Sequence, residues 1–228
     1  MALSTSRVIF QGQTEYAHER EAIAFAVDQL PDSDPYHLWA LVELLDPSTG
    51  RLYELDMLVL GYSALYLVEV KSGPGIYEGD QHDWYRIDPD SGRRSYRENP
   101  YRLTNHKAKV LKSALQRKMK TKRFTPWVEP LVFLSAEDTE LRLRNFGDSH
   151  VVTRKNFTRA ITHHEFPGAR PRSSSRRITA PAAREIAAAM KALGIQPRKG
   201  QAFVGRYELG QLLQEGQGYQ DREARHRD

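Results

Sequence analysis

The most apolar stretch of the chain also contains three charged residues, and this combination constrains what the chain can fold into. The stretch YELDMLVLGYSALYLVEVKSGPG covers residues 53–75 and places Asp56, Glu69 and Lys71 among aliphatic and aromatic residues. Burying an ionised group is costly unless it has a charged partner or a metal ion. The three charges therefore need partners within the fold.

The two halves of this stretch are predicted to be neighbouring strands, residues 51–60 and 64–71, joined by the short connection GYS. Side chains two residues apart on a strand point to the same face of a sheet, so Glu69 and Lys71 share a face. So short a connection favours antiparallel pairing, which places Asp56 across from this pair. Two carboxylates and one ammonium group are then expected to converge.

Such a convergence suits a divalent metal ion. Mg²⁺ binds oxygen ligands, commonly one or two carboxylates completed by water and phosphate oxygens. Asp56 and Glu69 can supply the carboxylates, and Lys71 can position or deprotonate a water or offset charge on a phosphate. An ordinary Glu–Lys ion pair is the alternative, and the Glu-x-Lys spacing alone favours it. The apolar context, the acidic strand before the pair and the Gly-Pro-Gly after it favour metal-dependent phosphodiester hydrolysis.

The rest of the sequence mixes helix and strand patterns and predicts an α/β fold. The helical patterns cover residues 15–30, 99–119 and 179–194, and further strand patterns cover residues 36–45, 129–135 and 150–153. Residues 73–98 are rich in turn-forming residues and are expected to be mostly loop, with one short strand in HDWYRI. Cysteine is absent, which excludes disulfides and thiolate metal sites. With no apolar run long enough to span a membrane, the chain is expected to be cytoplasmic.

One predicted helix opens a strongly basic segment. Residues 102–124 carry nine Lys or Arg and no Asp or Glu, whereas the net charge of the whole chain is +5. A run of this kind gives sequence-independent, salt-dependent affinity for phosphates, so we expect DNA to bind along the helix. A solvated helix face is the alternative. The candidate DNA-binding residues are Lys107, Lys109, Lys112, Arg117 and Lys118.

Residues from about 15 to 135 resemble the NERD (nuclease-related) domain, a member of the PD-(D/E)xK nuclease-like superfamily. The resemblance rests, in this order, on HEREA, PDSDPYHLW, YELDMLVL, LYLVEVKSGPG, a Trp in the following loop, NP at the start of a helix, and PLVFLS. It implies a restriction-endonuclease-like core, in which helices flank a central mixed sheet, followed here by a C-terminal helix and a tail.

The resemblance also implies roles for single residues. Asp56 is the metal-binding aspartate, Glu69 and Lys71 are the Glu-x-Lys pair, and Glu19 is the acidic residue contributed by the first helix. All four are thus candidate catalytic residues, and the three carboxylates are candidate ligands of Mg²⁺ or Mn²⁺. Glu21 competes with Glu19 for its role. One feature departs from the family: a glutamine usually follows the Asn-Pro closely, whereas NPYRLTNHKAK contains none.

The C-terminal stretch VGRYELGQLLQEGQGYQDREARH resembles the first strand and a degenerate glycine-rich loop of a protein kinase. The same arrangement follows a NERD domain in the PglW-like kinases of bacterial phage-defence (BREX or Pgl) systems. The expected organisation is a nuclease-like domain over residues 1–165, a basic linker and helix over 166–200, and the start of a kinase-like N-lobe over 201–228. No kinase lysine or catalytic Asp follows, so no kinase activity is expected of these residues. We expect the sequence to be the N-terminal portion of a longer kinase.

Three functional hypotheses follow. The first is a Mg²⁺-dependent DNA endonuclease-type domain. The second is a catalytically silent DNA-sensing module that regulates a kinase domain in cis. The third is an interaction or homodimerisation platform that needs neither DNA nor metal.

Overall fold

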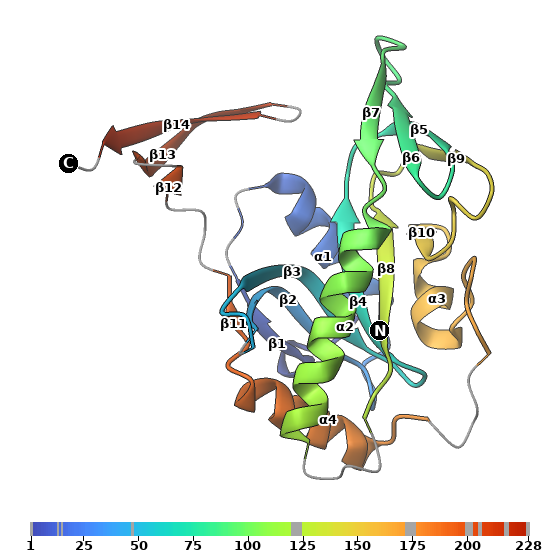
Figure 1. The fold of residues 1–228 in the computed structure, drawn as a ribbon, viewed down its shortest axis with the longest axis vertical. Coiled ribbons are helices and arrows are strands. Elements are labelled where there is room, and N and C mark those ends of the chain that lie inside the picture. The colour runs from blue at the N-terminus through green and yellow to red at the C-terminus, as the bar shows by residue number, and fades with distance from the viewer. Residues whose placement is uncertain are drawn as a thin grey trace.

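The computed structural model describes residues 2–12, 14, 16–46, 48–119, 125–171, 177–198, 203–204, 207–216 and 219–226. Within them, a seven-stranded mixed sheet has the order β1-β2-β3-β4-β8-β10, and β11 also pairs with β2 (Figure 1). The strands are β1 (Val8–Gln11), β2 (His37–Leu45), β3 (Leu52–Leu60), β4 (Leu65–Lys71), β8 (Val128–Leu134), β10 (Val151–Thr153) and β11 (Gln196–Pro197). The predicted α/β class with a central mixed sheet is confirmed.

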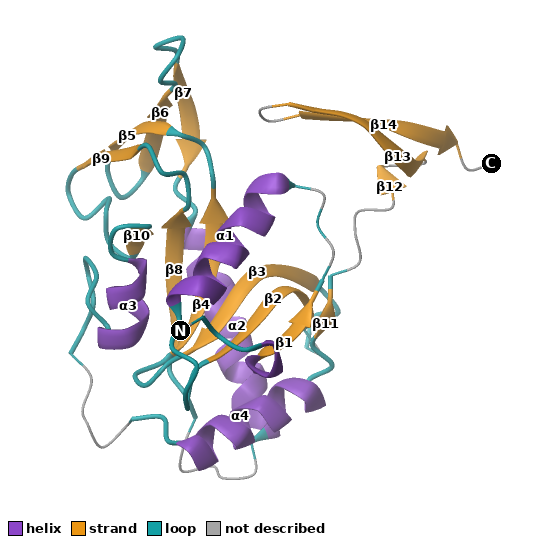
Figure 2. Cartoon of the chain, turned by 180° about the vertical axis from the view of Figure 1, so that it is seen from behind, coloured by secondary structure: helices purple, strands orange, loops and turns teal. Residues whose placement is uncertain are grey.

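Helices flank this sheet on both faces (Figures 1 and 2). They are α1 (Ala17–Gln29), α2 (Tyr101–Lys118), α3 (Phe157–His163) and α4 (Ala180–Ala192), and a short 3-10 turn, η1 (Thr5–Arg7), precedes β1. The predicted helices correspond to α1, α2 and α4, whereas α3 was not predicted. Among the described residues, no helix combines the length and the apolar character needed to cross a membrane.

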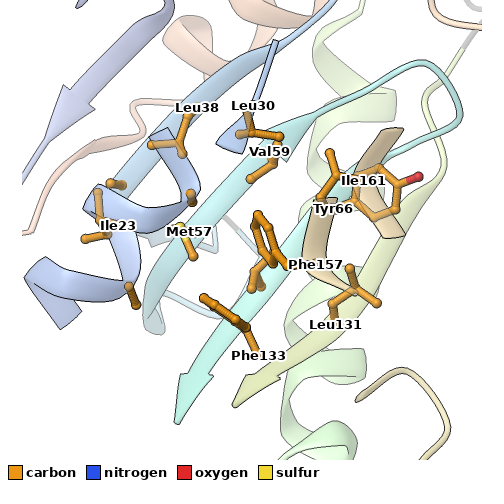
Figure 3. Close-up of a cluster of buried hydrophobic side chains, with 14 of the residues drawn as sticks. Ile23, Leu30, Leu38, Met57, Val59, Tyr66, Leu131, Phe133, Phe157 and Ile161 are labelled. Carbon is orange, nitrogen blue, oxygen red and sulfur yellow. The ribbon is translucent and has the colours of Figure 1, made fainter. Parts of the chain in front are cut away.

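Two hydrophobic cores lie on opposite faces of the sheet. The first packs α1 and α3 onto the sheet and contains Met57, Phe133 and Phe157 (Figure 3). The second packs α2 and α4 onto the other face and contains Leu58 and Met190. Helix α4 therefore shares a core with the central strands. The predicted domain boundaries stay a prediction.

The stretch after β4 differs from the prediction. Residues 73–98 are not mostly loop but contain β5 (Gly75–Gly79), β6 (Asp83–Ile87) and β7 (Arg94–Glu98), which join β9 (Thr139–Leu143) in a second sheet of order β7-β6-β5-β9. The short strand expected in HDWYRI is β6. A small core under this sheet includes Tyr77 and Trp84. Many of the other side chains of the sheet are exposed. The strand pattern is therefore weak in the sequence.

The Gly-Pro-Gly that follows β4 has a structural role in this second sheet. Gly75 has a φ of 112°, and a Cβ at this position would lie 2.2 Å from the carbonyl oxygen of Ile87. Only glycine permits this approach between β5 and β6. The turn and the strand pairing therefore account for Gly75 without a bound ligand.

The C-terminal residues form a third sheet. It contains β12 (Phe203–Val204), β13 (Tyr207–Gly216) and β14 (Tyr219–His226), paired antiparallel in that order. The expected strand is present as β13, but the charged residues at the end form a further strand rather than a tail. Gly218 of the predicted glycine-rich loop lies outside the described residues.

Candidate active site

Asp56 lies where the alternation of side chains breaks in two paired strands. In β2, Leu41 has a left-handed φ of 51°, and the residues on either side of it pack into opposite cores. In β3, the residues on either side of Asp56 also pack into opposite cores, and the pairing of β2 with β3 places Asp56 opposite Leu41. Breaks of this kind recur beside active sites, where they redirect a side chain.

The predicted pairing of Asp56 with the Glu-x-Lys strand is confirmed. Strands β3 and β4 are antiparallel, and Asp56 lies one residue beyond the Met57–Val68 pair. The backbone N–H of Val70 donates a hydrogen bond to Asp56 Oδ2 over 2.8 Å, which ties the carboxylate to the middle of the Glu-x-Lys motif. Burial, with a contribution from nearby Glu69, raises the pKa of Asp56 to about 7.

Glu69 accepts from two lysines. Its Oε1 lies 2.9 Å from Nζ of Lys71, and its Oε2 lies 2.9 Å from Nζ of Lys107 on α2. The ion pair expected as an alternative is thus present, and a second cation joins it. Burial alone would raise the pKa of Glu69, but the two ammonium groups outweigh it and hold the pKa below its ordinary value.

Lys71 keeps its charge in this environment. Burial alone would lower the pKa of Lys71, yet the carboxylates of Glu69, Asp56 and Glu19 outweigh burial and hold the pKa above its ordinary value. A protonated lysine cannot accept a proton from water. Its chemical use is therefore to orient a water or to stabilise negative charge on a phosphate.

Glu19, in the first turn of α1, faces the same carboxylates. It is close enough to Asp56 to contribute to that residue's raised pKa, and its side chain is only 12% exposed. Glu21, the competing candidate, also lines the cleft but is exposed to solvent. The fold therefore brings Glu19, Asp56, Glu69 and Lys71 together and leaves Glu21 at the margin.

One residue of this cluster was not predicted. The guanidinium of Arg198 pairs with Glu19, lies 3.7 Å from Asp56 Oδ1 and lies 3.7 Å from Glu54 Oε2. Its side chain is 9% exposed. Nothing in the local sequence QPRKG separates this arginine from an ordinary basic linker, because its partners are distant in the chain.

A cleft of about 980 Å³ opens over the cluster, and its lining combines acidic, basic and aromatic side chains. The acidic residues are Glu19, Glu21, Glu54, Asp56, Glu69 and Glu98. The cations are Lys71, Arg86, Arg97 and Lys107, and Lys71 and Lys107 pair directly with Glu69. A cleft of this kind offers both oxygen ligands and groups that attract an anion.

The second sheet supplies two aromatic side chains of this lining, Tyr77 and Trp84. The Tyr77 hydroxyl donates to the Gly73 carbonyl over 2.9 Å. Burial raises the pKa of Tyr77, while Arg86, Arg97 and Lys71 act to lower it, which places all three cations near that hydroxyl. Among the described residues, Nε1 of Trp84 and Nε of Arg86 are buried without a hydrogen-bond partner. Both atoms lie inside the protein and are not open to the cleft.

The acidic residues of the cleft match a hard divalent cation in chemical type, because Asp56, Glu69 and Glu19 all offer carboxylate oxygens. Their present arrangement is a different matter. In the part of the chain that the structure describes, no three acidic or histidine side chains are gathered closely enough to hold an ion. Each of the three carboxylates is instead near a cation of the protein itself.

The candidate DNA-binding residues of α2 divide into two groups. Lys107 is buried against Glu69 and belongs to the cleft. Lys109, Arg117 and Lys118 are exposed, and the ammonium of Lys112 lies 3.9 Å from the ring centre of Trp127. The rest of the basic run, residues 120–124, lies outside the described residues. DNA contact by this helix stays a prediction.

Residues 14–135, more than half of the chain, match the family described as NERD, nuclease-related domain. The chain belongs to the NERD family. The NERD match includes Glu19, Asp56, Glu69, Lys71 and Lys107, whereas Arg198 lies beyond it. The predicted family resemblance is confirmed, and the mixed sheet flanked by helices is consistent with a nuclease-like fold.

A curated relative extends the comparison beyond the NERD region. Over 217 residues, the chain is 32% identical to the probable kinase PglW of Streptomyces coelicolor. The matched region is 95% of this chain but 13% of that relative, so the chain spans about an eighth of its length. No solved structure matches the chain. The predicted similarity to PglW-like kinases is confirmed.

Proposed function

We propose that this NERD domain hydrolyses phosphodiester bonds of DNA with the help of Mg²⁺ or Mn²⁺. The observation that carries the proposal is the meeting of Asp56, Glu69 and Lys71 in one cleft, whose lining also includes further cations. Family membership supports the same conclusion, because the Asp and Glu-x-Lys positions fall within the NERD match.

The proposed division of labour follows from the contacts. Asp56, Glu69 and Glu19 are the residues that would hold the metal, which when bound would acidify a water and polarise a phosphoryl oxygen. The Val70 N–H keeps Asp56 in place, and Glu69 orients the Lys71 ammonium. Lys71 stays charged, and we assign it to the attacking water and to the negative charge that develops on the phosphate.

We propose that arginines in the lining of the cleft bind the DNA backbone. Arg86 and Arg97 line the cleft near the Tyr77 hydroxyl, and Arg97 is exposed to solvent. A phosphate accepts hydrogen bonds from arginine in a fixed, bidentate geometry. We therefore propose that the second sheet, and not only helix α2, contacts the strand to be cut.

Nicking of supercoiled plasmid tests the proposed activity. The chain is expected to convert supercoiled plasmid to open circles with Mg²⁺ or Mn²⁺ and to leave it intact in EDTA or Ca²⁺. Ca²⁺ is a useful control because it binds oxygen ligands but fits octahedral sites poorly. Equal nicking with and without chelator would contradict a metal-dependent mechanism.

The charge balance of the cleft favours one alternative, a catalytically silent DNA-sensing module. Glu19 and Asp56 contact Arg198, and Glu69 contacts two lysines, so the protein already supplies cations for the three candidate ligands. A silent module is expected to bind DNA without cutting it under any of the metal conditions above. The nicking assay combined with a binding assay therefore separates the two functions.

The exposed cations of α2 make a separate prediction about DNA affinity. Changing Lys109, Arg117 and Lys118 to alanine is expected to make the plot of log K for DNA binding against log salt concentration less steep by about 2.7. The reason is that each phosphate contact contributes about 0.9 to that slope. Fluorescence anisotropy of labelled duplex DNA at several salt concentrations measures it. As a matched control, alanine at Arg20, Arg159 and Lys191, which are also exposed, should leave the slope unchanged. An unchanged slope in the α2 variant would mean that these three cations face solvent and do not contact DNA phosphates.

The relation to kinases completes the proposal. The relative is a probable kinase, and this chain corresponds to 13% of it, which supports a kinase domain in cis with this NERD domain. We propose that the NERD domain serves such a kinase, and that the whole acts in phage defence as the resemblance to PglW-like kinases implies.

A further inference from the structure

Arg198 reaches the carboxylate cluster from an unusual place in the sheet. The outer edge of β2 is shared, because β1 pairs with its first half and β11 with its second half. Arg198 directly follows β11, and its backbone N–H donates to the carbonyl of Leu41 over 2.6 Å. Leu41 is the residue with the left-handed backbone opposite Asp56. The edge of the sheet thus directs this arginine toward the metal-ligand candidates.

The close approach at this edge depends on a glycine. A Cβ on Gly12, which directly follows β1, would lie 2.1 Å from the Leu41 carbonyl oxygen and 2.7 Å from the Arg198 backbone nitrogen. Both contacts are with backbone atoms, which cannot swing away as a long side chain can. The absence of a side chain at Gly12 therefore leaves room for residue 198 to dock.

The segment is also complementary to the acidic surface that it covers. Gln196 donates to Glu43 over 3.4 Å, and the Arg198 guanidinium lies among Glu19, Glu54 and Asp56. Arg198 is not one of the residues that line the cleft, so it reaches these carboxylates from the sheet edge. Its hold on the sheet is short, since β11 pairs with β2 through only Gln196 and Pro197.

We infer that residues 196–198 act as an internal gate, in which Arg198 occupies the carboxylates of Glu19 and Asp56 and a divalent metal displaces it. Glu19 Oε2 accepts from the Arg198 guanidinium and so is not free to coordinate a metal, and a metal held by Glu19 and Asp56 would place a second positive charge beside that guanidinium. Docking of the segment and binding of the metal therefore oppose each other. The inference rests on the metal site of the proposed function but does not require that DNA be cut.

The position of the gate gives it a direction of control. Arg198 lies outside residues 14–135, so the nuclease-related domain is held closed by a part of the chain that precedes the third sheet. Coupling between two binding events is reciprocal. Metal binding to the carboxylates therefore favours release of residues 196–198, and any event that pulls this segment away raises the affinity of Glu19 and Asp56 for metal.

Metal affinity tests the gate directly. The Arg198→Ala chain is expected to bind Mn²⁺ about 10-fold more tightly than the unchanged chain, which corresponds to the loss of one competing interaction of about 1.4 kcal/mol. Isothermal titration calorimetry or the EPR signal of free Mn²⁺ measures this affinity. Arg7→Ala is the matched control, because Arg7 also bridges two carboxylates, Asp32 and Asp34, but away from the cleft. It should leave the affinity unchanged.

A second measurement leaves the sequence untouched and so does not depend on how a variant folds. Hydrogen exchange of the Arg198 amide, followed by mass spectrometry of peptides over residues 196–198, is expected to accelerate several-fold when Mg²⁺ or Mn²⁺ is added. The reason is that metal binding releases the hydrogen bond to Leu41. In the Asp56→Asn chain the metal should have no such effect.

The outcomes separate this inference from the proposed function. Equal Mn²⁺ affinity with and without Arg198, or exchange that metal leaves unchanged or slows, would overturn the gate while leaving a metal-dependent nuclease in place. Weaker Mn²⁺ binding in the Arg198→Ala chain would also overturn it and make Arg198 a supporting residue of the site. An absence of Mn²⁺ binding in both chains would overturn the gate and the proposed metal site together.

Discussion

Changing Asp56 to asparagine is expected to lower metal-dependent plasmid nicking by about 100-fold or more while the fold stays intact. Loss of a metal ligand removes several kcal/mol of transition-state stabilisation, and each 1.36 kcal/mol is a factor of ten in rate. The amide of asparagine has nearly the shape of the carboxylate and keeps an oxygen to accept from the Val70 N–H. The change is therefore specific to charge and metal binding.

The stability of this variant follows from the same environment. Burial raises the pKa of Asp56 to about 7, far above its ordinary value, so near neutral pH the folded protein favours the neutral form more than the unfolded chain does, and the buried charge lowers stability. Asparagine removes this penalty, so the melting temperature is expected not to fall. Glu21→Gln is the matched control for activity, because Glu21 lines the same cleft but is exposed. Full nicking by the Asp56→Asn chain would show that Asp56 is not needed for catalysis. Loss of nicking in the Glu21→Gln chain would show that Glu21, rather than or as well as Glu19, takes part in it.

Changing Lys107 to alanine is expected to destabilise the fold by about 3 kcal/mol, at the low end of the range for breaking a buried ion pair. Lys107 and Glu69 are each only 11% exposed at their side chains, and their charged atoms are 2.9 Å apart. Without Lys107, one oxygen of Glu69 stays buried without its partner. Lys71 still contacts the other oxygen, which keeps the loss from being larger.

Urea denaturation at neutral pH measures this loss. Lys109→Ala provides the control, because Lys109 is two residues away on the same helix, carries the same charge and is exposed. Its effect on the free energy of unfolding should stay within about 0.5 kcal/mol. A loss of that small size in the Lys107→Ala chain would mean that Lys107 does not hold Glu69 and belongs with the exposed cations after all.

The centre of the site could be predicted because it is encoded locally. Two-residue alternation put Glu69 and Lys71 on one face, and the short connection to the previous strand placed Asp56 beside them; the structure agrees on both points. The helix of Glu19 could be predicted from its periodicity. The roles of these residues as metal ligands came from the family resemblance, and they stay predictions.

The rest could not be predicted, because it depends on contacts between distant residues. Lys107 looked like one of many cations on a basic helix, and only the packing of α2 onto the sheet turns it toward Glu69. Arg198 lies 142 positions beyond Asp56, and no periodicity connects them. The left-handed backbone of Leu41 carries no sequence signal, since a glycine or asparagine would be expected there.

The second sheet was missed for a related reason. Its strands bury few apolar residues, among them Tyr77 and Trp84, and they expose many polar ones, so their composition resembles that of a loop. Alternation is readable only when one face of a strand is consistently apolar. The small core beneath these strands also contains Val132 and Leu134 of the central sheet. The strands of the second sheet therefore contribute few apolar residues of their own, and their hydrophobic alternation is weak.

The hydrogen bond from the Val70 N–H to Asp56 links assembly of the site to the pairing of β3 and β4 during folding. If β3 and β4 slipped by one residue, Glu69 and Lys71 would turn to the opposite face, and Asp56 would lose the N–H that holds it. The cluster of charges therefore exists only when the strands are in correct register. Under the proposed function, a chain whose strands have not yet paired in this register would lack the nuclease site and would not cut the DNA of the cell that makes it.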